Sequence, residues 1–173
     1  MPTAARDRLI STAERLFYAE GVRAVGVERL LAESGVGRAS FYRHFPGKDD
    51  LVVTVLGERL ARWRADLAAG VQARGGGVAA VFDVLAGQFA ATDFRGCAAV
   101  NTMVEEADAT SAAHRVAAAH KAELAAYLGD LAGDAERGEQ LLILVDGAIV
   151  TALRDPGPAA AHRAAAMAEL LMG

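Results

Sequence analysis

Residues 38–45 of this chain place cations and hydroxyls around aromatic rings at helical spacing. Phe41 and Phe45 stand one helical turn apart, so a helix through them buries both rings on the same face. Arg38 and Arg43 then point away from the core. Guanidinium groups on an exposed helix face can contact phosphates and base edges in a DNA major groove, which admits one helix. The plainer interpretation is a short amphipathic helix whose basic face is solvated.

The residues before this stretch predict a helix-turn-helix. Val27, Leu30 and Leu31 share one face at helical spacing, and Gly35 follows where a left-handed residue ends a helix. Residues 35–37 then form a short turn between this helix and the next one. The basic residues are thus predicted on the second helix of a pair.

Two more helices are predicted on either side of this pair. The apolar residues from Leu9 to Leu16 recur with the period of an amphipathic helix, which is expected to end at Gly21. A longer helix begins at Lys48, because two acids in its first turn favour a helix N-terminus there. It is expected to end near Gly70, so that three short helices precede a long fourth one.

The run FYRHFPGKDDL at residues 41–51, within the stretch from Arg6 to Leu56, resembles the TetR family of bacterial transcriptional repressors. The resemblance implies a positioning helix at 27–34 and a recognition helix at 38–44. Contacts with bases or nearby phosphates then fall to Arg38, Ala39, Ser40 and Arg43. The resemblance also implies that Tyr42, His44 and Lys48 contact the DNA backbone.

Some of these roles have simpler alternatives. Lys48 begins a helix whose free N–H groups favour a phosphate, but it can also be merely solvated. His44 can instead cap its own helix. The chain departs from the family pattern at 25–26, where Val-Gly replaces a common Thr or Ser, and at Gly47, where Ser is common. Fewer hydroxyl contacts with phosphates are therefore expected at those two points.

Composition favours a small helical protein. The chain has 173 residues, forty of them alanine and only 4 of them proline, and no segment alternates apolar and polar residues as a half-buried strand does. We expect an all-α fold with an N-terminal helix-turn-helix domain at 1–48. The long fourth helix joins it to a helical effector-binding and dimerisation domain at 49–173.

Charge is distributed unevenly along the chain. The net charge is −4, but residues 1–64 carry +3 and residues 65–173 carry −7. The basic excess therefore lies with the helix-turn-helix, as a DNA-binding segment requires. A positive end can approach phosphate while the acidic part stays away from it.

No sequence feature predicts a metal, a cofactor or a membrane span. The chain has 1 Cys and no Cys/His cluster with zinc-like spacing. The N-terminus lacks the apolar core of a signal peptide, and the most apolar run, 140–153, is interrupted by Asp146 and too short to span a bilayer. We expect a cytoplasmic protein that uses no cofactor and is not an enzyme. A hydrolase built on Cys97, either His114 or His120, and Asn101 lacks any nucleophile turn or oxyanion loop.

After the glycine run at 75–77, helices are predicted at 78–92, 95–107, 112–132, 138–154 and 157–172. Several polar side chains fall among apolar neighbours there, where each needs a partner. The family resemblance implies an effector pocket in this region, for a small and largely apolar molecule with one hydrogen-bonding end. Its expected lining is Phe82, Phe89, Cys97, Asn101, His120 and Tyr127, and it is the apolar walls and few polar groups of this lining that favour such a molecule. The alternatives are an ordinary core and a ligand-insensitive DNA-binding or accessory dimer.

The last two helices predict a partner. Apolar residues occupy almost the whole circumference of the helix at 138–154, so a single buried face cannot hide them. The resemblance implies a four-helix bundle with a second copy, and such a homodimer matches palindromic operator DNA. A core helix within one chain is the alternative. The expected interface residues are Leu142, Val145, Ile149, Leu153, Ala164, Met167 and Leu171. Together these features predict a homodimeric repressor that a small effector releases from its operator.

Overall fold

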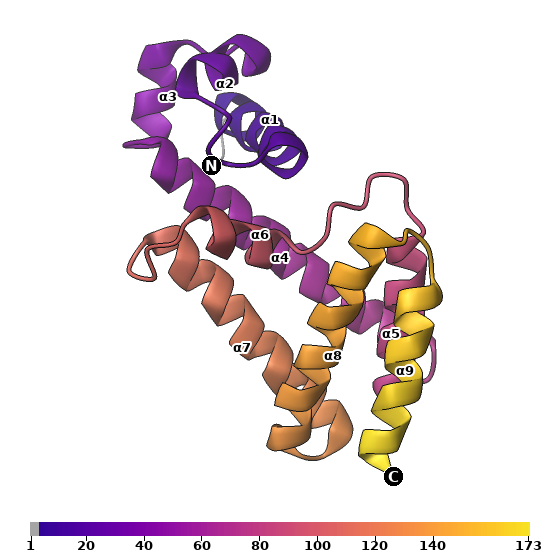
Figure 1. The fold of residues 1–173 in the computed structure, drawn as a ribbon. Coiled ribbons are helices and arrows are strands. Elements are labelled where there is room, and N and C mark those ends of the chain that lie inside the picture. The colour runs from indigo at the N-terminus through magenta and orange to yellow at the C-terminus, as the bar shows by residue number, and fades with distance from the viewer. Residues whose placement is uncertain (1–3) are drawn as a thin grey trace. The chain divides into compact units, whose positions relative to one another are not determined.

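The structure is a computed structural model that describes residues 4–173. In that part of the chain the backbone forms nine α-helices and no strand, which confirms the all-α class (Figure 1). The helices are α1 (Ala4–Glu20), α2 (Val27–Ser34), α3 (Arg38–His44), α4 (Lys48–Ala73), α5 (Val78–Phe89), α6 (Ala98–Glu105), α7 (Ala112–Ala132), α8 (Ala135–Arg154) and α9 (Ala159–Met172).

Helices α2 and α3 have the predicted bounds, and α1 ends before Gly21 as predicted. Gly21 follows α1 with φ +88° and Gly35 ends α2 with φ +64°, both left-handed conformations that glycine adopts without strain. Leu9 and Leu16 of α1 are fully buried, as their helical period indicates. These helices share a core with Phe41 and Phe45 of α3.

Later helix boundaries differ from the predicted ones for local reasons. The segment between α5 and α6 is longer than expected because Gly96, at φ +80°, adopts a conformation outside the right-handed helix. Helix α8 begins earlier than expected because Asp134 caps it: its carboxylate accepts a hydrogen bond from Arg137 N at 2.8 Å. Three successive glycines with positive φ, Gly75 to Gly77, separate α4 from α5.

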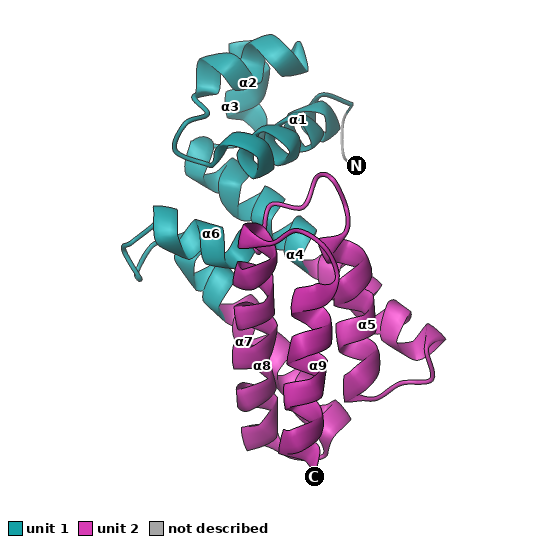
Figure 2. Cartoon of the chain, turned by 45° about the vertical axis from the view of Figure 1, so that its right-hand side comes forward, with its two compact units in different colours: residues 1–60, 98–118 teal, residues 61–97, 119–173 magenta. Residues whose placement is uncertain are grey.

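The chain forms two compact units (Figure 2). The first unit comprises residues 1–60 and 98–118, of which 4 onward are described, and the second comprises residues 61–97 and 119–173. This division differs from the boundary expected at residue 48, because the start of α4, all of α6 and the start of α7 group with the first three helices. Ala113 of α7 belongs to the same apolar core as Phe41.

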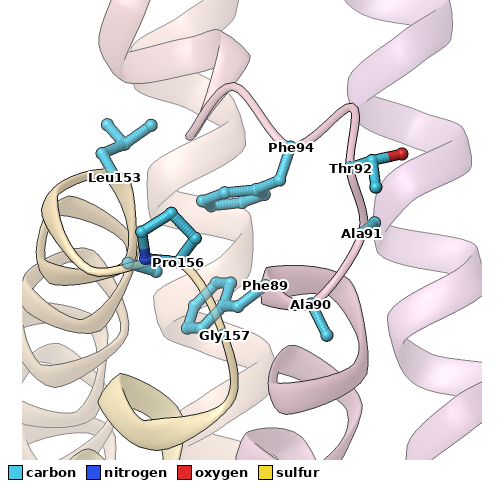
Figure 3. Close-up of a pocket in the computed structure, with 9 residues that line it drawn as sticks. Phe89, Ala90, Ala91, Thr92, Phe94, Leu153, Pro156 and Gly157 are labelled. Atoms are coloured by element: carbon cyan, nitrogen blue, oxygen red, sulfur yellow. The ribbon is translucent and has the colours of Figure 1, made fainter.

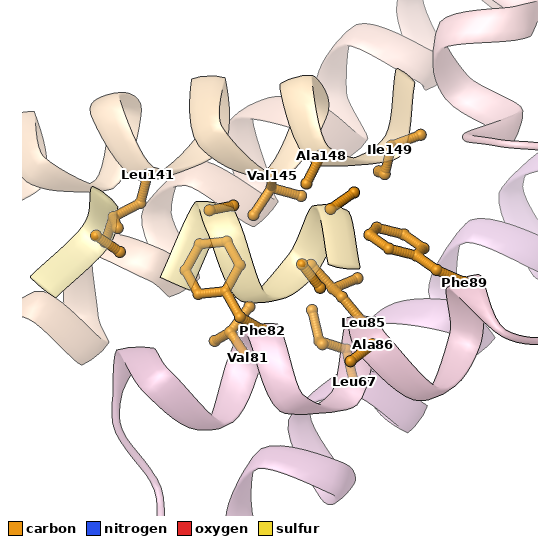
Figure 4. Packing of buried hydrophobic residues seen from close by; sticks show 14 of the residues in the cluster. Leu67, Val81, Phe82, Leu85, Ala86, Phe89, Leu141, Val145, Ala148 and Ile149 are labelled. Carbon is orange, nitrogen blue, oxygen red and sulfur yellow. The ribbon is translucent and has the colours of Figure 1, made fainter. Parts of the chain in front are cut away.

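The second unit is built on α5, α8 and α9, which pack against one another. Figure 4 shows Phe82 and Phe89 of α5 facing Leu141 and Ile149 of α8, with α9 between them. Small side chains let α9 approach both neighbours closely. Its buried residues are all alanines: Ala160, Ala161, Ala164 and Ala168.

Helices α7 and α8 cross at a pair of glycines. A Cβ added to Gly138 would lie 2.4 Å from Ala125 O and 2.7 Å from Gly129 N. Both of these are backbone atoms, so no side-chain rearrangement would make room for it. The two helix backbones therefore touch at this crossing, and only glycine fits there.

Candidate functional site

Helix α3 is anchored by its aromatic residues. Phe41 is fully buried and Phe45 is 3% exposed, so both rings face the core as their spacing predicts. The two ring centroids lie 6.1 Å apart, and Tyr42 packs edge-on against Phe41 at 5.1 Å. The orientation of α3 about its own axis is therefore fixed by apolar contacts on a single face.

The opposite face of α3 presents the predicted DNA-contacting residues. Arg38, Ala39, Tyr42 and Arg43 are exposed. Ser40 and His44 are half-buried at the edges of this face. Arg43 forms no ion pair or side-chain hydrogen bond within the described part of the chain, so its guanidinium is available to a partner. The arrangement suits a helix that inserts into a groove, with cations and hydroxyls outward and aromatic rings inward.

Carboxylates on α2 pair with neighbouring arginines. Glu28 forms an ion pair with Arg38, and its hydrogen bond raises the pKa of that guanidinium. Arg29 bridges Glu20 of α1 at 2.6 Å and Glu33 of α2 at 2.8 Å. All these groups are exposed, so each pair adds little stability. At the recognition helix, the Arg38 guanidinium is thus already paired with Glu28, a contact that sequence reasoning missed.

Two hydrogen bonds hold the turn between α2 and α3. Arg8 Nε on α1 donates to Ser34 O at 3.2 Å, and the Ser34 hydroxyl accepts from Val36 N at 3.3 Å. These bonds satisfy backbone groups left over at the end of α2. Helix α1 thereby fixes the point from which α3 leaves.

Lys48 is the first residue of α4, where the sequence predicts it. Its Nζ donates a hydrogen bond to Val22 O at 2.7 Å, in the turn between α1 and α2. An ammonium has three donors, so this bond leaves capacity for a phosphate. Lys48 therefore has a structural role whether or not DNA is bound.

The residues expected to line an effector pocket are distributed over both compact units. Phe82 and Phe89 are 0% and 1% exposed and belong to the core of the second unit. Cys97 is half-buried against the same core. Asn101 is exposed and belongs to the first unit, whereas the other predicted residues belong to the second.

His120 is buried and belongs to a cluster of polar side chains inside the second unit. Its Nδ1 lies 2.9 Å from Arg64 Nη1, and because a guanidinium only donates, Nδ1 is the acceptor of a neutral imidazole. Arg64 also pairs with Glu123 at 2.6 Å, and the Trp63 ring packs edge-on against the imidazole at 5.6 Å. Burial, together with the charges of Lys121 and Arg64, lowers the pKa of His120 to about 4.

The Tyr127 hydroxyl is the other polar group of interest here. It is buried, and no hydrogen-bond partner for it exists among the described residues. Burial raises the pKa of Tyr127. A buried hydroxyl without a partner is unfavourable, so this atom is a natural anchor for a water molecule or for the polar end of a ligand.

The surface of the second unit includes the following two cavities. One, of about 330 Å³, lies between the end of α5 and the α8–α9 turn. Figure 3 shows Phe89 and Phe94 beside it, across from Leu153 and Pro156. The other, of about 450 Å³, lies near the C-terminus and is lined by Val78, Ala79, Leu131, Ala165, Ala168, Glu169, Met172 and Gly173.

The residues expected at a dimer interface divide into two sets. Val145, Ile149 and Ala164 are buried within the protomer. Leu142 and Leu171 are half-buried, whereas Leu153 is 48% and Met167 55% exposed. Exposed apolar residues that the expected set omitted are Ile143, Val150 and Leu170, at 71%, 59% and 84%.

Helix α8 thus has an apolar buried face and a second, exposed apolar face. Ile143 and Val150 lie two helical turns apart and so share one face of α8, away from the buried Val145 and Ile149. Their spacing groups them on one face, but it does not say which face is buried. Large apolar side chains gathered on exposed helix faces indicate an interaction surface. Helix α9, which packs beside α8, adds Met167 and Leu170.

Within residues 4–173, no three His, Cys, Asp or Glu side chains gather as metal ligands would. No helix in the same range is long and apolar enough to cross a membrane.

The N-terminal helices match a known family of bacterial proteins. Residues 9–55 match the family model described as bacterial regulatory proteins, tetR family. The chain is 37% identical over 54 residues to the HTH-type transcriptional regulator LmrA of Bacillus subtilis, covering 31% of this chain and 29% of that protein. It is 38% identical over 55 residues to an HTH-type transcriptional repressor of Streptomyces coeruleorubidus, covering 32% of this chain and 20% of that protein. These matches thus span less than a third of the curated relatives.

One solved structure is similar along nearly the whole chain. It is a TetR-family transcriptional regulator from Streptomyces coelicolor, with a TM-score of 0.91 and 32% sequence identity. The superposition covers 99% of this chain and 90% of that one. The similarity therefore includes the second unit as well as the helix-turn-helix.

Proposed function

The chain belongs to the TetR family of bacterial regulatory proteins, and on this premise we propose that it is a sequence-specific DNA-binding transcriptional regulator. The observation that carries the proposal is α3, with Arg38 and Arg43 exposed on one face and Phe41 and Phe45 buried on the other. A cytoplasmic location is part of this proposal, because a bacterial DNA-binding regulator acts where the DNA is. The homologues are regulators, which sets aside the hydrolase considered from the sequence.

In this proposal α3 enters the major groove. Arg43 and Arg38 contact bases or nearby phosphates together with Ala39 and Ser40, while Tyr42, His44 and Lys48 contact the backbone. Arg38 donates to Glu28 through Nη2, so in this proposal the carboxylate competes with DNA for part of the guanidinium. Phosphate contacts fix the register of the helix, and base-edge contacts select the sequence.

The test begins by selecting bound duplexes from fragmented genomic DNA. Replacing Arg43 by Ala should weaken binding of the selected duplex by about 1–3 kcal/mol if the side chain reads a base. Replacing Lys48 by Ala should weaken all sequences alike and lower the slope of log affinity against log salt by roughly 0.9. Arg74→Ala, an exposed arginine of the second unit, is the matched control. Failure of the wild type to enrich any duplex would contradict the proposal.

We further propose that the regulator is a homodimer through α8 and α9. The exposed apolar residues of both helices support it, because removing apolar side chains from water lowers the free energy of the assembled protein. Two copies related by a two-fold axis read a palindromic operator. Sedimentation of the wild type at micromolar concentration tests this directly, and a folded monomer would overturn it.

The finer proposal is a repressor released by a small, largely apolar effector bound in the second unit. The unpaired Tyr127 hydroxyl supports it by offering one hydrogen bond to a ligand. A ligand at roughly 100-fold over its Kd should stabilise the protein by about 2.7 kcal/mol and weaken operator binding. A thermal-shift screen of apolar metabolites, repeated with Tyr127→Phe, is the measurement.

A ligand-insensitive regulator is the second candidate. The burial of Phe82 and Phe89 favours it, because both rings already pack against other apolar side chains of the core. A screen without any shift, alongside intact DNA binding, would support this candidate over the sensor. DNA binding stands under either outcome.

A further inference from the structure

The turn between α1 and α2 is held from two separate parts of the chain. Lys48, at the start of α4, donates to Val22 O at 2.7 Å. The side chain of Glu105, at the end of α6, accepts a hydrogen bond from Arg23 N at 2.9 Å. The turn is thus hydrogen-bonded, through two neighbouring backbone groups, to side chains from two helices that are distant from it in sequence.

The turn is shaped to receive the Glu105 carboxylate. Gly21 has φ +88°, and a Cβ there would lie 2.9 Å from Glu105 Oε1. The carboxylate therefore lies over the glycine with one oxygen while the other accepts the Arg23 amide. A residue with a side chain at position 21 would both strain the backbone and displace this carboxylate.

The segment that carries Glu105 is itself anchored in the first unit. Ala113, eight residues on from Glu105, is buried in the core with the helix-turn-helix. His114 Nδ1 bonds to Glu106 O at 2.9 Å, which ties the end of α6 to the start of α7. The carboxylate is thus presented from a fixed support, not from a free loop.

We infer that Glu105 is a positioning residue for DNA binding, which sets the α1–α2 turn and through it the helices that follow. The inference rests on the proposed function. The turn leads directly into α2, the helix that precedes α3, so loosening it leaves α3 less well placed to meet the groove. Residues 98–118 thereby act as part of the DNA-reading unit although they are remote from it in sequence.

The experiment compares three variants on the duplex selected with the wild type. Glu105→Ala removes the acceptor, and Glu105→Gln removes the charge but keeps an oxygen that can accept from Arg23 N. Glu106→Ala removes the same charge one residue away, from a side chain that forms no hydrogen bond or ion pair in the described chain. It therefore controls for the general effect of lost negative charge on DNA affinity.

Glu105→Ala is expected to bind the duplex roughly threefold to tenfold more weakly than Glu106→Ala, the range for one net hydrogen bond. Glu105→Gln should recover part of this loss. Amide hydrogen exchange supplies a readout without DNA: the Arg23 amide should exchange faster in Glu105→Ala than in Glu106→Ala, with a thermal unfolding midpoint lowered by no more than the few degrees that one lost hydrogen bond causes. A general structural defect would lower the midpoint further and would not respond to the Gln variant.

Equal affinities of Glu105→Ala and Glu106→Ala would overturn the inference, as would unchanged exchange at Arg23. The proposed function would still stand if Arg43→Ala lost binding in the same assay. If the wild type enriched no duplex, the proposed function and this inference would fall together, and the exchange result would then report only on the turn.

Discussion

The two units of this chain leave different side chains unsatisfied. In the first unit, arginines and carboxylates pair on the surface, as Arg29 does with Glu20 and Glu33, yet Arg43 has no such partner among the described residues. In the second unit His120 pairs with Arg64 in the interior, the buried Tyr127 hydroxyl has no partner among the described residues, and apolar residues such as Ile143 stay exposed. Each unit thus exposes the chemistry that its own packing does not use. A free guanidinium suits DNA, and an uncovered isoleucine suits another protein surface.

The largest expected effect tests the packing of the second unit. Phe82→Ala should lower the free energy of unfolding by about 3–5 kcal/mol, because it removes a fully buried ring and leaves a cavity. Urea unfolding followed by the fluorescence of Trp63, the chain's 1 tryptophan, measures it. Val104→Ala, at a residue 76% exposed, is the control and should change little. A loss under about 1 kcal/mol for Phe82→Ala would indicate a loosely packed pocket in place of a core.

The next effect separates the exposed face of α8 from its buried face. Ile143→Glu should leave the fold intact, because the side chain is 71% exposed, and should weaken dimerisation by roughly 2–4 kcal/mol. Sedimentation equilibrium measures the dimer, and circular dichroism checks the fold. Ala122→Glu, on an exposed position of α7, is the matched control. A dimer as tight as that of the wild type would place the interface elsewhere.

A third effect comes from the buried imidazole. The folded chain lowers the pKa of His120 from 6.5 to about 4, so the unfolded chain binds the proton more readily. The free energy of unfolding should therefore fall as the pH drops from about 6.5 to 4, with a loss of roughly 2 kcal/mol between pH 7 and pH 5. His120→Gln should reduce this loss, whereas His162→Gln, at an exposed position, should keep it. Identical acid profiles for all three proteins would exclude His120 as the cause.

The smallest effect concerns the ion pair at the recognition helix. Glu28→Gln should release Arg38 and remove an acidic group near the DNA, so binding should tighten by about 0.5 kcal/mol. The gain should shrink as salt is raised, because the pair is exposed. Binding of the selected duplex at two salt concentrations measures it. If Glu28→Gln bound more weakly, the carboxylate would be orienting Arg38 for DNA instead of competing for it.

The sequence was informative where local chemistry decides the structure. Gly35 and the pair Phe41 and Phe45 determine a turn and a buried face within a few residues, so α2 and α3 follow directly from spacing. The bounds of α7 were likewise those expected from periodicity. Helix class and ends are local properties, and glycine and capping residues mark them.

The candidate sites were harder to predict from the sequence, because contacts between distant segments determine which residues are buried and which are exposed. An apolar helix such as α8 shows that two faces need cover, but not which residues face the core and which face outward. Ile149 is buried and Ile143 exposed, although their types are the same. The hydrogen bond between Glu105 and the Arg23 amide has no local signature in the sequence. A glutamate that accepts such a bond cannot be distinguished by sequence from one that is only solvated.

The crossing of α7 and α8 limits how this sequence can vary. Alanine replaces most small residues in helices with little penalty, and the chain uses it freely, but at position 138 even that methyl group would meet Ala125 O at 2.4 Å. Every amino acid other than glycine has a Cβ, so every missense mutation of that codon inserts the same atom into the same backbone. In a library of random variants selected for folding, position 138 would remain glycine while exposed neighbours such as Glu139 diversify. This backbone contact thus restricts position 138 to glycine, although it involves no side chain.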